Sequence, residues 1–573
     1  MRKTDNLFSG LYRLGFSPFK QTITALIWLV LSFEVAGADL TSANQAYESG
    51  DLEAAFAAFA ELAEQGDIAA QVRLAAMYNE GEGVEQDLGE AGRLYKQAAE
   101  AGDPEALVAM GDRFIAGLEG VPDMDEALGL YRQAANKNYA PARVKLGNMY
   151  FTGQGVEKDL QEAADFFRLA AEQNNDQALV ALGNLYATGQ GLAQDQEEAV
   201  RLYRLAAEQG FAPAQVNLGN QYYTGQGVAQ DYNEAMRLYE LAAEQDYDPA
   251  QVFLGNIYTD GVIVAQDYDL ARTLFTDAAD QSNAEAIFML GYLFENGLGV
   301  DADFEQALRL YERAADFGSA EAQFTLGVKY DTGEGFPRNA TIAASLFQLA
   351  AQQGFARAQV ALANKLYLGL GVPQNHPEAL RYYRLAADQQ NPEAQTNLGV
   401  MYTNGQAVDQ DFAEAIRLYL KAAEQDYPQA LVNLGWMYAN GMGVEMDLAE
   451  TIRYYRLAAE QNDAQAMVNL GNMYANGQGA AQDFVEAVNF FRKAAHLGFS
   501  PAQANLAVMY VNGLGVPEVS VQTAYMWASL AAEQGNTQAV NYLEILAQQL
   551  SPDEIEAARE YASNCVENEF RGC

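Results

Sequence analysis

The sequence predicts an all-α fold, a right-handed superhelical solenoid of about fourteen helix pairs with a 36-residue period. Three observations lead to this prediction. The chain has 573 residues, which is more than one hydrophobic core accommodates. A short Leu-Gly step recurs at a fixed interval, and a fixed period of about 20 to 50 residues is typical of a solenoid. Two amphipathic helical patterns fill each interval.

The Leu-Gly step sets the register of the repeat. The stretch "LGNMYANGQG" begins at Leu470, and close copies begin at Leu146 and Leu182. We call the second residue of this pattern the step residue. Step residues follow one another at intervals of 36, at Ala75, Gly111, Gly147, Gly183, Gly219, Gly255, Gly291, Gly327, Ala363, Gly399, Gly435, Gly471 and Ala507.

Each repeat is expected to contain two helices. Between Asp463 and Gly498, apolar residues spaced i, i+4, i+7 and i+8 predict a first helix, and a similar set predicts a second. The two sets are Ala466, Leu470, Met473 and Tyr474, then Ala487, Phe490, Phe491 and Ala494. Small residues such as Gly471 allow the two helices to approach closely, and Tyr474 adds bulk to the same seam.

Glycine and aspartate are expected to separate the two helices. A glycine stands six residues after every step residue, as at Gly477, where a helix end needs a positive φ. An Asp then begins the second helix, and in several repeats a Glu follows three residues later, as in Asp87 and Glu90. We expect the Asp to accept backbone N–H groups and the Glu to reach back, as in a capping box. Glu–Arg pairs at i, i+3 are expected outside, as in Glu90–Arg93, Glu198–Arg201 and Glu414–Arg417.

Residues 1–38 have the composition of a signal peptide. Arg2 and Lys3 make the start positive, Ile23 to Phe33 is an apolar run of eleven residues, and a small-residue cleavage site ends at Ala38. The apolar run is shorter than the roughly 20 residues that span a bilayer. We therefore expect export, cleavage after Ala38 and no membrane insertion afterwards. An uncleaved anchor is the alternative.

The only two cysteines, Cys565 and Cys573, lie at the end of a predicted helical cap, residues 536–573. In that cap Ser551 is the expected N-cap of a helix. The cysteines can pair after export to an oxidising compartment. Pairing requires the chain to turn back near Arg571, because a continuous helix would hold residues eight apart about 12 Å from each other. The alternative is two unpaired thiols.

The repeat resembles the SEL-one-like repeat (SLR) family, which is related to tetratricopeptide repeats. The resemblance rests on Leu-Gly-x-x-Tyr-x-x-Gly-x-Gly-Val, a following Asp, and Ala-Ala-Glu-Gln-Gly, and it covers thirteen repeats over residues 67–535. Residues 39–66 are similar to a plain tetratricopeptide helix pair. The resemblance implies a non-catalytic helical scaffold. In bacterial envelopes such proteins generally act as adaptors that regulate signalling proteins, assist assembly of polysaccharide-secreting machinery or contact host proteins.

Composition argues against several classes of function. The chain has 77 acidic and 34 basic residues, a net charge of −43, which disfavours nucleic acid and anionic membranes as partners. The two histidines, His376 in a predicted turn and His496 near a helix end, lie in different repeats and make no convincing metal site or catalytic triad. Both are expected to be solvated. We expect no enzyme activity, cofactor or metal. A glycosidase that uses carboxylates alone is the minor alternative.

Function is expected on the solvent face of the first helices. Two positions on this face, two residues before and one residue after the step residue, are rich in asparagine. They hold Asn217, Asn397, Asn433, Asn469 and Asn505, and Asn148, Asn184, Asn220, Asn256, Asn364 and Asn472. An amide both donates and accepts, so this asparagine row suits an extended peptide backbone or glycan hydroxyls. The alternative is that these residues bond neighbouring helices or keep the groove wet.

Apolar residues interrupt the asparagine row. Phe253, Met289 and Tyr292 replace its polar members in consecutive repeats, with Ile263 in an irregular turn nearby, and Trp436 replaces an Asn further on. Exposed aromatic and Met side chains are favoured anchors at interfaces. The alternative is local repacking.

The expected function is that of an exported, monomeric scaffold that binds a protein partner through its concave face, as a periplasmic adaptor or regulator in envelope signalling or assembly. A module that binds envelope or extracellular glycan is the alternative. A secreted factor that contacts host proteins is the third hypothesis.

Overall fold

The structure is a computed structural model that describes residues 39–568. These residues form two compact units that divide after Gln266, and each unit is described by itself. The predicted signal peptide with its cleavage site at Ala38, and Cys573, lie outside the described residues.

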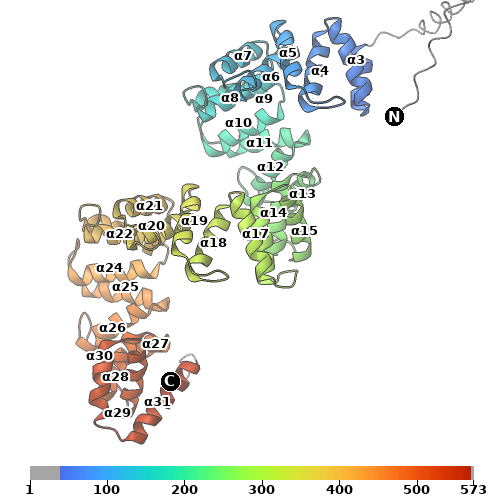
Figure 1. Ribbon diagram of the computed structural model, residues 1–573. Helices are drawn as coiled ribbons and strands as arrows, with labels where there is room; N and C mark the ends of the chain where they lie inside the picture. The colour runs from blue at the N-terminus through green and yellow to red at the C-terminus, as the bar shows by residue number, and fades with distance from the viewer. Residues whose placement is uncertain (1–38, 569–573) are drawn as a thin grey trace, which may run out of the picture. The chain divides into compact units, whose positions relative to one another are not determined.

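The helices of both units are α-helices, most of them thirteen residues long. In the first unit they are α2 (Leu40–Glu48), α3 (Leu52–Glu64), α4 (Ile68–Glu80), α5 (Leu88–Glu100), α6 (Pro104–Ile115), α7 (Met124–Asn136), α8 (Ala140–Thr152), α9 (Leu160–Ala171), α10 (Asp176–Thr188), α11 (Gln196–Glu208), α12 (Ala212–Thr224), α13 (Tyr232–Ala243) and α14 (Asp248–Asp260) (Figure 1).

The division between the units falls inside one repeat. The first helix of this repeat, α14, ends the first unit, and its second helix, α15, begins the second unit. Its helices are α15 (Tyr268–Asp280), α16 (Ala284–Asn296), α17 (Phe304–Asp316), α18 (Ala320–Thr332), α19 (Ala340–Gln352), α20 (Ala356–Leu368), α21 (His376–Asp388), α22 (Pro392–Asn404), α23 (Phe412–Ala423), α24 (Pro428–Asn440), α25 (Leu448–Glu460), α26 (Ala464–Asn476), α27 (Phe484–His496), α28 (Ser500–Asn512), α29 (Val521–Glu533), α30 (Thr537–Ala547) and α31 (Pro552–Glu567).

Within each unit the helices stack in chain order, and each repeat packs on the next (Figure 1). First helices of successive repeats also touch, as α10 does with α12 and α26 with α28. No strand occurs among residues 39–568. The prediction of an all-α solenoid with two helices per repeat is therefore confirmed.

In most helix pairs the seam is closed by a glycine against an aromatic ring, and Ala75, Ala363 and Ala507 take the place of the glycine in the others. A Cβ atom built on Gly435 would lie 2.5 Å from the Tyr455 ring, and one on Gly183 would lie 2.6 Å from the Tyr203 ring. The ring that leaves no room for a side chain at the step residue therefore belongs to the second helix, twenty residues after the step residue. It is not the aromatic residue three places after the step residue. Tyr474 instead stacks on Phe490 at a ring distance of 5.9 Å.

The predicted turn glycines have the expected conformation. The glycine six residues after each step residue has a positive φ in every repeat, for example 68° at Gly477. The second glycine of the turn is less regular in sequence, and Ala407, which replaces it in one repeat, has a φ of 58°. The turn geometry is thus kept there with a residue for which it is strained.

Aspartates cap most of the second helices, as predicted, but the predicted capping box does not form there, so this prediction is wrong. Asp87 accepts from the backbone N–H groups of Gly89 and Glu90, both at 3.0 Å. The N–H of Asp87 already donates to the carbonyl of Tyr78 at 2.9 Å, which leaves nothing for Glu90 to accept. The carboxylate of Glu90 pairs instead with Arg93, and the predicted Glu198–Arg201 and Glu414–Arg417 pairs also form.

The chain ends of the described region are helical. A reciprocal capping box occurs at Asp39 with Ser42 before α2, and another at Ser551 with Glu554 before α31. The predicted N-cap at Ser551 is therefore confirmed. α31 packs on α29 and buries Cys565. The Cys565–Cys573 pairing stays a prediction, because Cys573 lies outside the described residues. Within residues 39–568 no helix is long and apolar enough to cross a membrane.

Candidate functional site

The solvent side of the first helices, which we call the first-helix face, carries the residues predicted to bind partners. In α26 it consists of Gln465, Asn469, Asn472 and Asn476, while Leu470 and Met473 point into the core. The same positions face solvent in the first helix of the other repeats. Residues on this face are therefore not needed to fill the core.

Several asparagines of the row are held by bonds within the protein. In the first unit the side-chain oxygen of Asn184 accepts from the Tyr203 hydroxyl at 2.7 Å and from the amide of Asn217 at 3.3 Å. Asn220 likewise accepts from the Tyr239 hydroxyl at 2.7 Å. These bonds join the first helix to its own second helix and to the next repeat.

The second unit repeats this arrangement once in full. Asn364 accepts from Tyr383 at 2.6 Å and from Asn397 at 3.3 Å. Asn472 accepts only from Asn505, at 3.4 Å, because Phe491 stands in the place of the tyrosine. Some asparagines of the row, such as Asn184 and Asn364, therefore join neighbouring helices through their side-chain oxygens. Others, such as Asn472, lack the hydrogen bond from a tyrosine hydroxyl.

The remaining predicted asparagines make local bonds. Asn433 accepts from Gln429 at 3.2 Å, and its amide nitrogen is buried with no hydrogen-bond partner. Asn469 accepts from Gln465 at 2.9 Å. An unpaired buried N–H costs free energy, so Asn433 has unused donor capacity on this face.

The predicted apolar anchors divide between the two units. In the first unit Phe253 is 39% exposed and stacks on Tyr239 at a ring distance of 5.6 Å, and Ile263 is partly buried. In the second unit Met289 is partly buried and Tyr292 is 40% exposed. Each unit therefore presents a half-exposed aromatic residue on its first-helix face.

Trp436 is the third large aromatic residue of this face. It lies in α24 and is 43% exposed. A half-exposed tryptophan offers a large apolar ring and one N–H donor to a partner. No aromatic contact within the described residues fixes its ring.

Two hollows lie on the first-helix face, one in each unit. In the first unit a pocket of about 420 Å³ is lined by Asn148, Asn184, Phe151, Phe167 and Gln190, among others. In the second unit a pocket of about 330 Å³ lies between α28, α29 and α30. Both are open depressions of the size that accepts a side chain or a short segment.

Three buried cations were not predicted from the sequence. Arg113, Lys329 and Lys365 lie two residues after a step residue, where most repeats have a buried Met or Leu. Arg113 bonds Glu119 at 2.7 Å, and Glu119 replaces the second glycine of its turn. The signal was visible as a Lys or Arg at an otherwise apolar position of the repeat.

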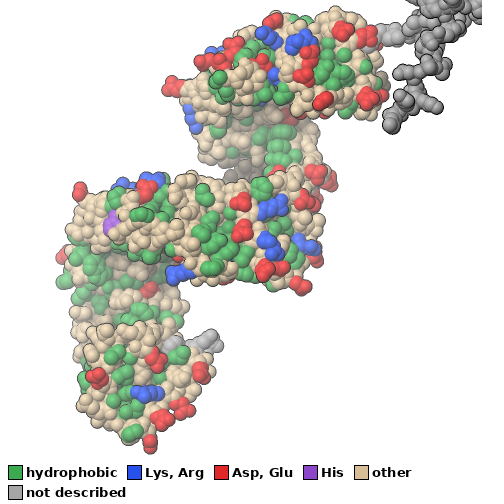
Figure 2. Space-filling model, viewed as in Figure 1, with side chains coloured by type: hydrophobic (Ala, Val, Ile, Leu, Met, Phe, Trp, Pro, Cys, Tyr) green, Lys and Arg blue, Asp and Glu red, His purple; other side chains and the backbone are tan. Residues whose placement is uncertain are grey.

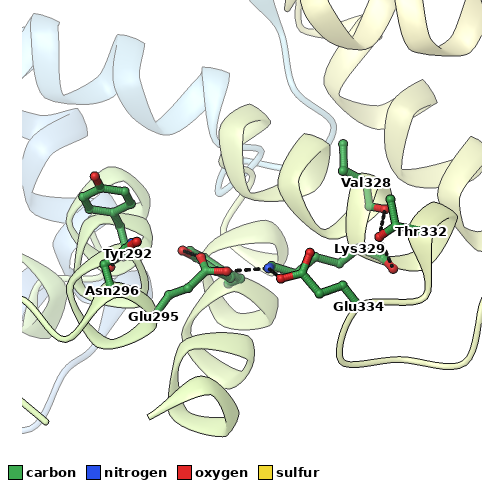
Figure 3. A network of polar contacts seen from close by, with 8 residues as sticks. Tyr292, Glu295, Asn296, Val328, Lys329, Thr332 and Glu334 are labelled. Atoms are coloured by element: carbon green, nitrogen blue, oxygen red, sulfur yellow. Dashed lines mark hydrogen bonds and ion pairs between the residues drawn. The ribbon is translucent and has the colours of Figure 1, made fainter. Parts of the chain in front are cut away.

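Lys329 is at the centre of a polar network in the second unit (Figure 3). Its ammonium bonds Glu295 of the preceding repeat at 2.5 Å and Glu334 at 3.3 Å, and the Tyr311 hydroxyl donates to Glu295 at 2.6 Å. Burial opposes the charge of Glu295, but the bonds from Lys329 and Tyr311 outweigh it and lower the pKa of Glu295. Lys365 pairs with Asp331 in the same way, so two ion pairs link three successive repeats.

The histidines differ from expectation. His376 begins α21 rather than lying in a turn, and it stacks on Tyr367 at 5.0 Å. His496 ends α27, and its Nε2 atom is buried without a partner rather than solvated. Burial and the nearby Arg492 lower the pKa of His496. Within residues 39–568 no group of three or more His, Cys, Asp or Glu is placed to hold a metal ion.

Comparison with known repeats identifies the class. A profile of the Sel1 repeat matches thirteen consecutive segments, from residues 68–103 to residues 500–536. The chain belongs to the Sel1 repeat family. Sel1 repeats form helical scaffolds that typically mediate protein–protein interaction, and the family is generally non-catalytic.

Solved structures agree with this assignment. A protective antigen of uropathogenic Escherichia coli with an SLR fold is 30% identical over 84% of this chain and 96% of its own, with a TM-score of 0.49. A Sel1 repeat protein from Oxalobacter formigenes is 32% identical over 54% of this chain and 90% of its own, with a TM-score of 0.42. No curated protein is similar enough to this chain to count as a match.

One more distant structure shares only the fold of these Sel1 repeats. The Cut9–Hcn1 hetero-tetramer of the APC/C contains a chain that is 15% identical over 92% of this chain and 98% of its own, with a TM-score of 0.50.

Proposed function

We propose that this chain is an exported, non-catalytic scaffold that holds a protein partner against its first-helix face, as an adaptor or regulator in the bacterial envelope. The observation that carries the proposal is the half-exposed aromatic side chains of Phe253, Tyr292 and Trp436 on a face that the core does not need. Aromatic residues are enriched among the few residues that dominate interface energy. Curved repeat arrays bind partners on an extended concave surface, and we propose that this face lines it.

Export and a periplasmic location rest on the composition of residues 1–38. Cell fractionation and N-terminal sequencing of the mature protein test this part. We expect the first residue to be Asp39. A mature chain that retains Met1 in the inner-membrane fraction would show an uncleaved anchor instead.

Cross-linking capture from an envelope extract tests partner binding. The bait is compared with three variants, Phe253→Ala, Tyr292→Ala and Trp436→Ala. Phe317→Ala is the matched control, because Phe317 is also a half-exposed aromatic residue, 51% exposed, but follows the second helix α17. We expect a captured protein that is lost with at least one of the three variants and retained with the control.

Equal capture by all variants would contradict the aromatic anchors. If no protein is captured and the bait binds purified envelope glycan, the alternative glycan-binding function replaces the proposal. The asparagine row is the feature that would serve such a ligand, because its amides match hydroxyl groups.

A further inference from the structure

Three successive first helices of the second unit carry no charged residue. The sequences of α24, α26 and α28 are PQALVNLGWMYAN, AQAMVNLGNMYAN and SPAQANLAVMYVN. The chain as a whole has a net charge of −43, and every first helix from α16 to α22 contains at least one charged residue. In the first unit α12 also carries no charged residue, but the first helices on either side of it, α10 and α14, do. The run of three uncharged first helices is therefore the local feature.

The neighbouring second helices keep their charges. α25 carries the Glu450–Arg453 pair, and α27 carries Glu486 and Lys493. In Figure 2 the surface over α24 to α26 is mostly tan and green, with few red or blue side chains. The absence of charge is thus confined to the first helices of this segment, whose solvent side we call the neutral row. It consists of Gln429, Asn433, Trp436, Asn440, Gln465, Asn469, Asn472, Asn476, Pro501, Asn505, Val508 and Asn512.

The amides of the neutral row have unused bonding capacity. The Asn433 amide nitrogen is buried without a partner. The side-chain oxygens of Asn469 and Asn472 accept from Gln465 and Asn505, but their amide nitrogens donate to no atom of the described residues. A ligand with acceptor groups along this row would satisfy the amide donors of Asn469 and Asn472, whose nitrogens are not buried.

An apolar pocket lies at the end of the neutral row. Asn505 and Val508 of the row line it together with Ala528, Tyr542 and Ile545, and its volume is about 330 Å³. Ile545 is 55% exposed. Gln538 and Asn541 also line it, so the pocket accepts an apolar side chain beside amide groups that can form hydrogen bonds.

We propose that the neutral row binds an extended, uncharged peptide segment whose backbone carbonyls accept from the Asn amides and whose apolar side chain enters the pocket at Ile545. A peptide uses both features at once, because its backbone carbonyls match the amide donors and one apolar side chain fits against Val508, Tyr542 and Ile545. This inference rests on the proposed function and narrows it to one segment and one partner chemistry.

The length and neutrality of the row define the segment. Three repeats of about 10 Å each give about 30 Å, which an extended chain of about nine residues spans at about 3.3 Å per residue. About a quarter of residues in proteins are charged, so only about 8% of nine-residue windows lack a charge. A charged side chain on the row would lose water without gaining a partner of opposite sign. Neutrality therefore selects among partner segments.

Selection of phage-displayed random dodecapeptides on the purified full chain tests the inference. We expect the enriched peptides to lack Asp, Glu, Lys and Arg over about nine residues and to contain a large apolar residue. A fluorescent copy of one selected peptide then gives a binding constant by anisotropy. Both a Lys and an Asp placed at its centre should weaken binding at least tenfold.

Variants of the protein locate the site. Trp436→Ala, Asn472→Asp and Ile545→Asp should each weaken peptide binding at least tenfold, with unchanged helicity by circular dichroism. Asn148→Asp is the matched control, because Asn148 has the same place in its repeat as Asn472 and its repeat likewise has a phenylalanine, Phe167, in the place of the tyrosine. It should bind the peptide like the parent chain.

Four outcomes would overturn the inference. Enriched peptides that carry charges, or equal binding by parent and variants, would show that the neutral row is not the peptide site, while a partner captured from the envelope would keep the proposed function standing. Binding of a neutral glycan that Trp436→Ala abolishes, without any enriched peptide, would assign the row to glycan. Failure of both peptide selection and envelope capture would remove the inference and the proposed function together.

Discussion

The Glu295–Lys329 ion pair allows a sharp test of how buried charge contributes to this solenoid. The side chain of Lys329 is 6% exposed and that of Glu295 is 23% exposed. Glu295→Ala leaves the Lys329 ammonium with only Glu334, which is itself 59% exposed and 3.3 Å away. Breaking a buried pair costs about 3–5 kcal/mol, and the partial exposure and the second partner place this variant at about 2–3 kcal/mol.

Removing both charges together should not destabilise the protein in this way. In the repeats of α24 and α26, Ala439 and Met473 occupy the positions that Glu295 and Lys329 occupy in theirs, and Met473 is buried. The double variant Glu295→Ala, Lys329→Met is made in a Tyr311→Phe parent, because Glu295 is also the acceptor of the Tyr311 hydroxyl. It then installs residues that this fold already accommodates, since Phe491 occupies the Tyr311 position in the α26 repeat. We expect its stability to lie within about 1 kcal/mol of the parent, or above it, because a well-packed apolar pair needs no desolvation of charge.

Hydrogen exchange measured by mass spectrometry over α16 to α18 is the assay, because a repeat array opens locally and a single unfolding midpoint does not isolate one interface. The pH dependence follows from the lowered pKa of Glu295. A depressed carboxyl pKa contributes stability that is present above the unfolded value of about 4.3 and is lost as pH falls through the folded value. The cost of Glu295→Ala should therefore shrink between pH 7 and pH 3. A double variant as weakly protected as Glu295→Ala alone would refute the reasoning.

Three further predictions concern the helix seams. Asn184→Ala removes the acceptor of the Tyr203 hydroxyl and should cost about 1–2 kcal/mol, whereas Asn148→Ala should cost less than about 0.5 kcal/mol, as measured by hydrogen exchange over the helix pair that holds each residue. Gly435→Val should cost about 3 kcal/mol, since its Cβ would lie 2.5 Å from the Tyr455 ring; protection of α24 and α25 equal to that of the parent would contradict this. Burial raises the pKa of Tyr203 and Tyr455 to about 12. The stability these tyrosines contribute is complete below the unfolded pKa of about 10 and is lost as pH rises towards 12. Phenolate absorbance and circular dichroism should therefore change together above pH 10.

The sequence alone determined the repeat, its two helices and its turns. These features depend on residues close together in the chain: the apolar spacing of each helix, the turn glycine such as Gly477 with its positive φ, and the Asp that caps the next helix, such as Asp87. Local geometry and a strict period were sufficient for them. The capping box does not form because the N–H of Asp87 donates to the carbonyl of Tyr78 in the preceding helix. That bond depends on how the two helices pack, and helical spacing alone does not predict it.

Only the tertiary structure decided which side chains of the candidate site are free. Asn184 and Asn148 occupy the same place in their repeats, yet Asn184 is bonded to the hydroxyl of Tyr203, nineteen residues later, while the residue nineteen after Asn148 is Phe167, which has no hydroxyl to donate. Lys329 looks like a surface residue until the preceding repeat brings Glu295, 34 residues earlier, to within 2.5 Å. The stacking of one repeat on the next brings such residues into contact. The sequence specifies which residues face solvent through helical spacing, but the distance between two atoms on neighbouring helices depends on how closely a glycine and a ring allow those helices to pack.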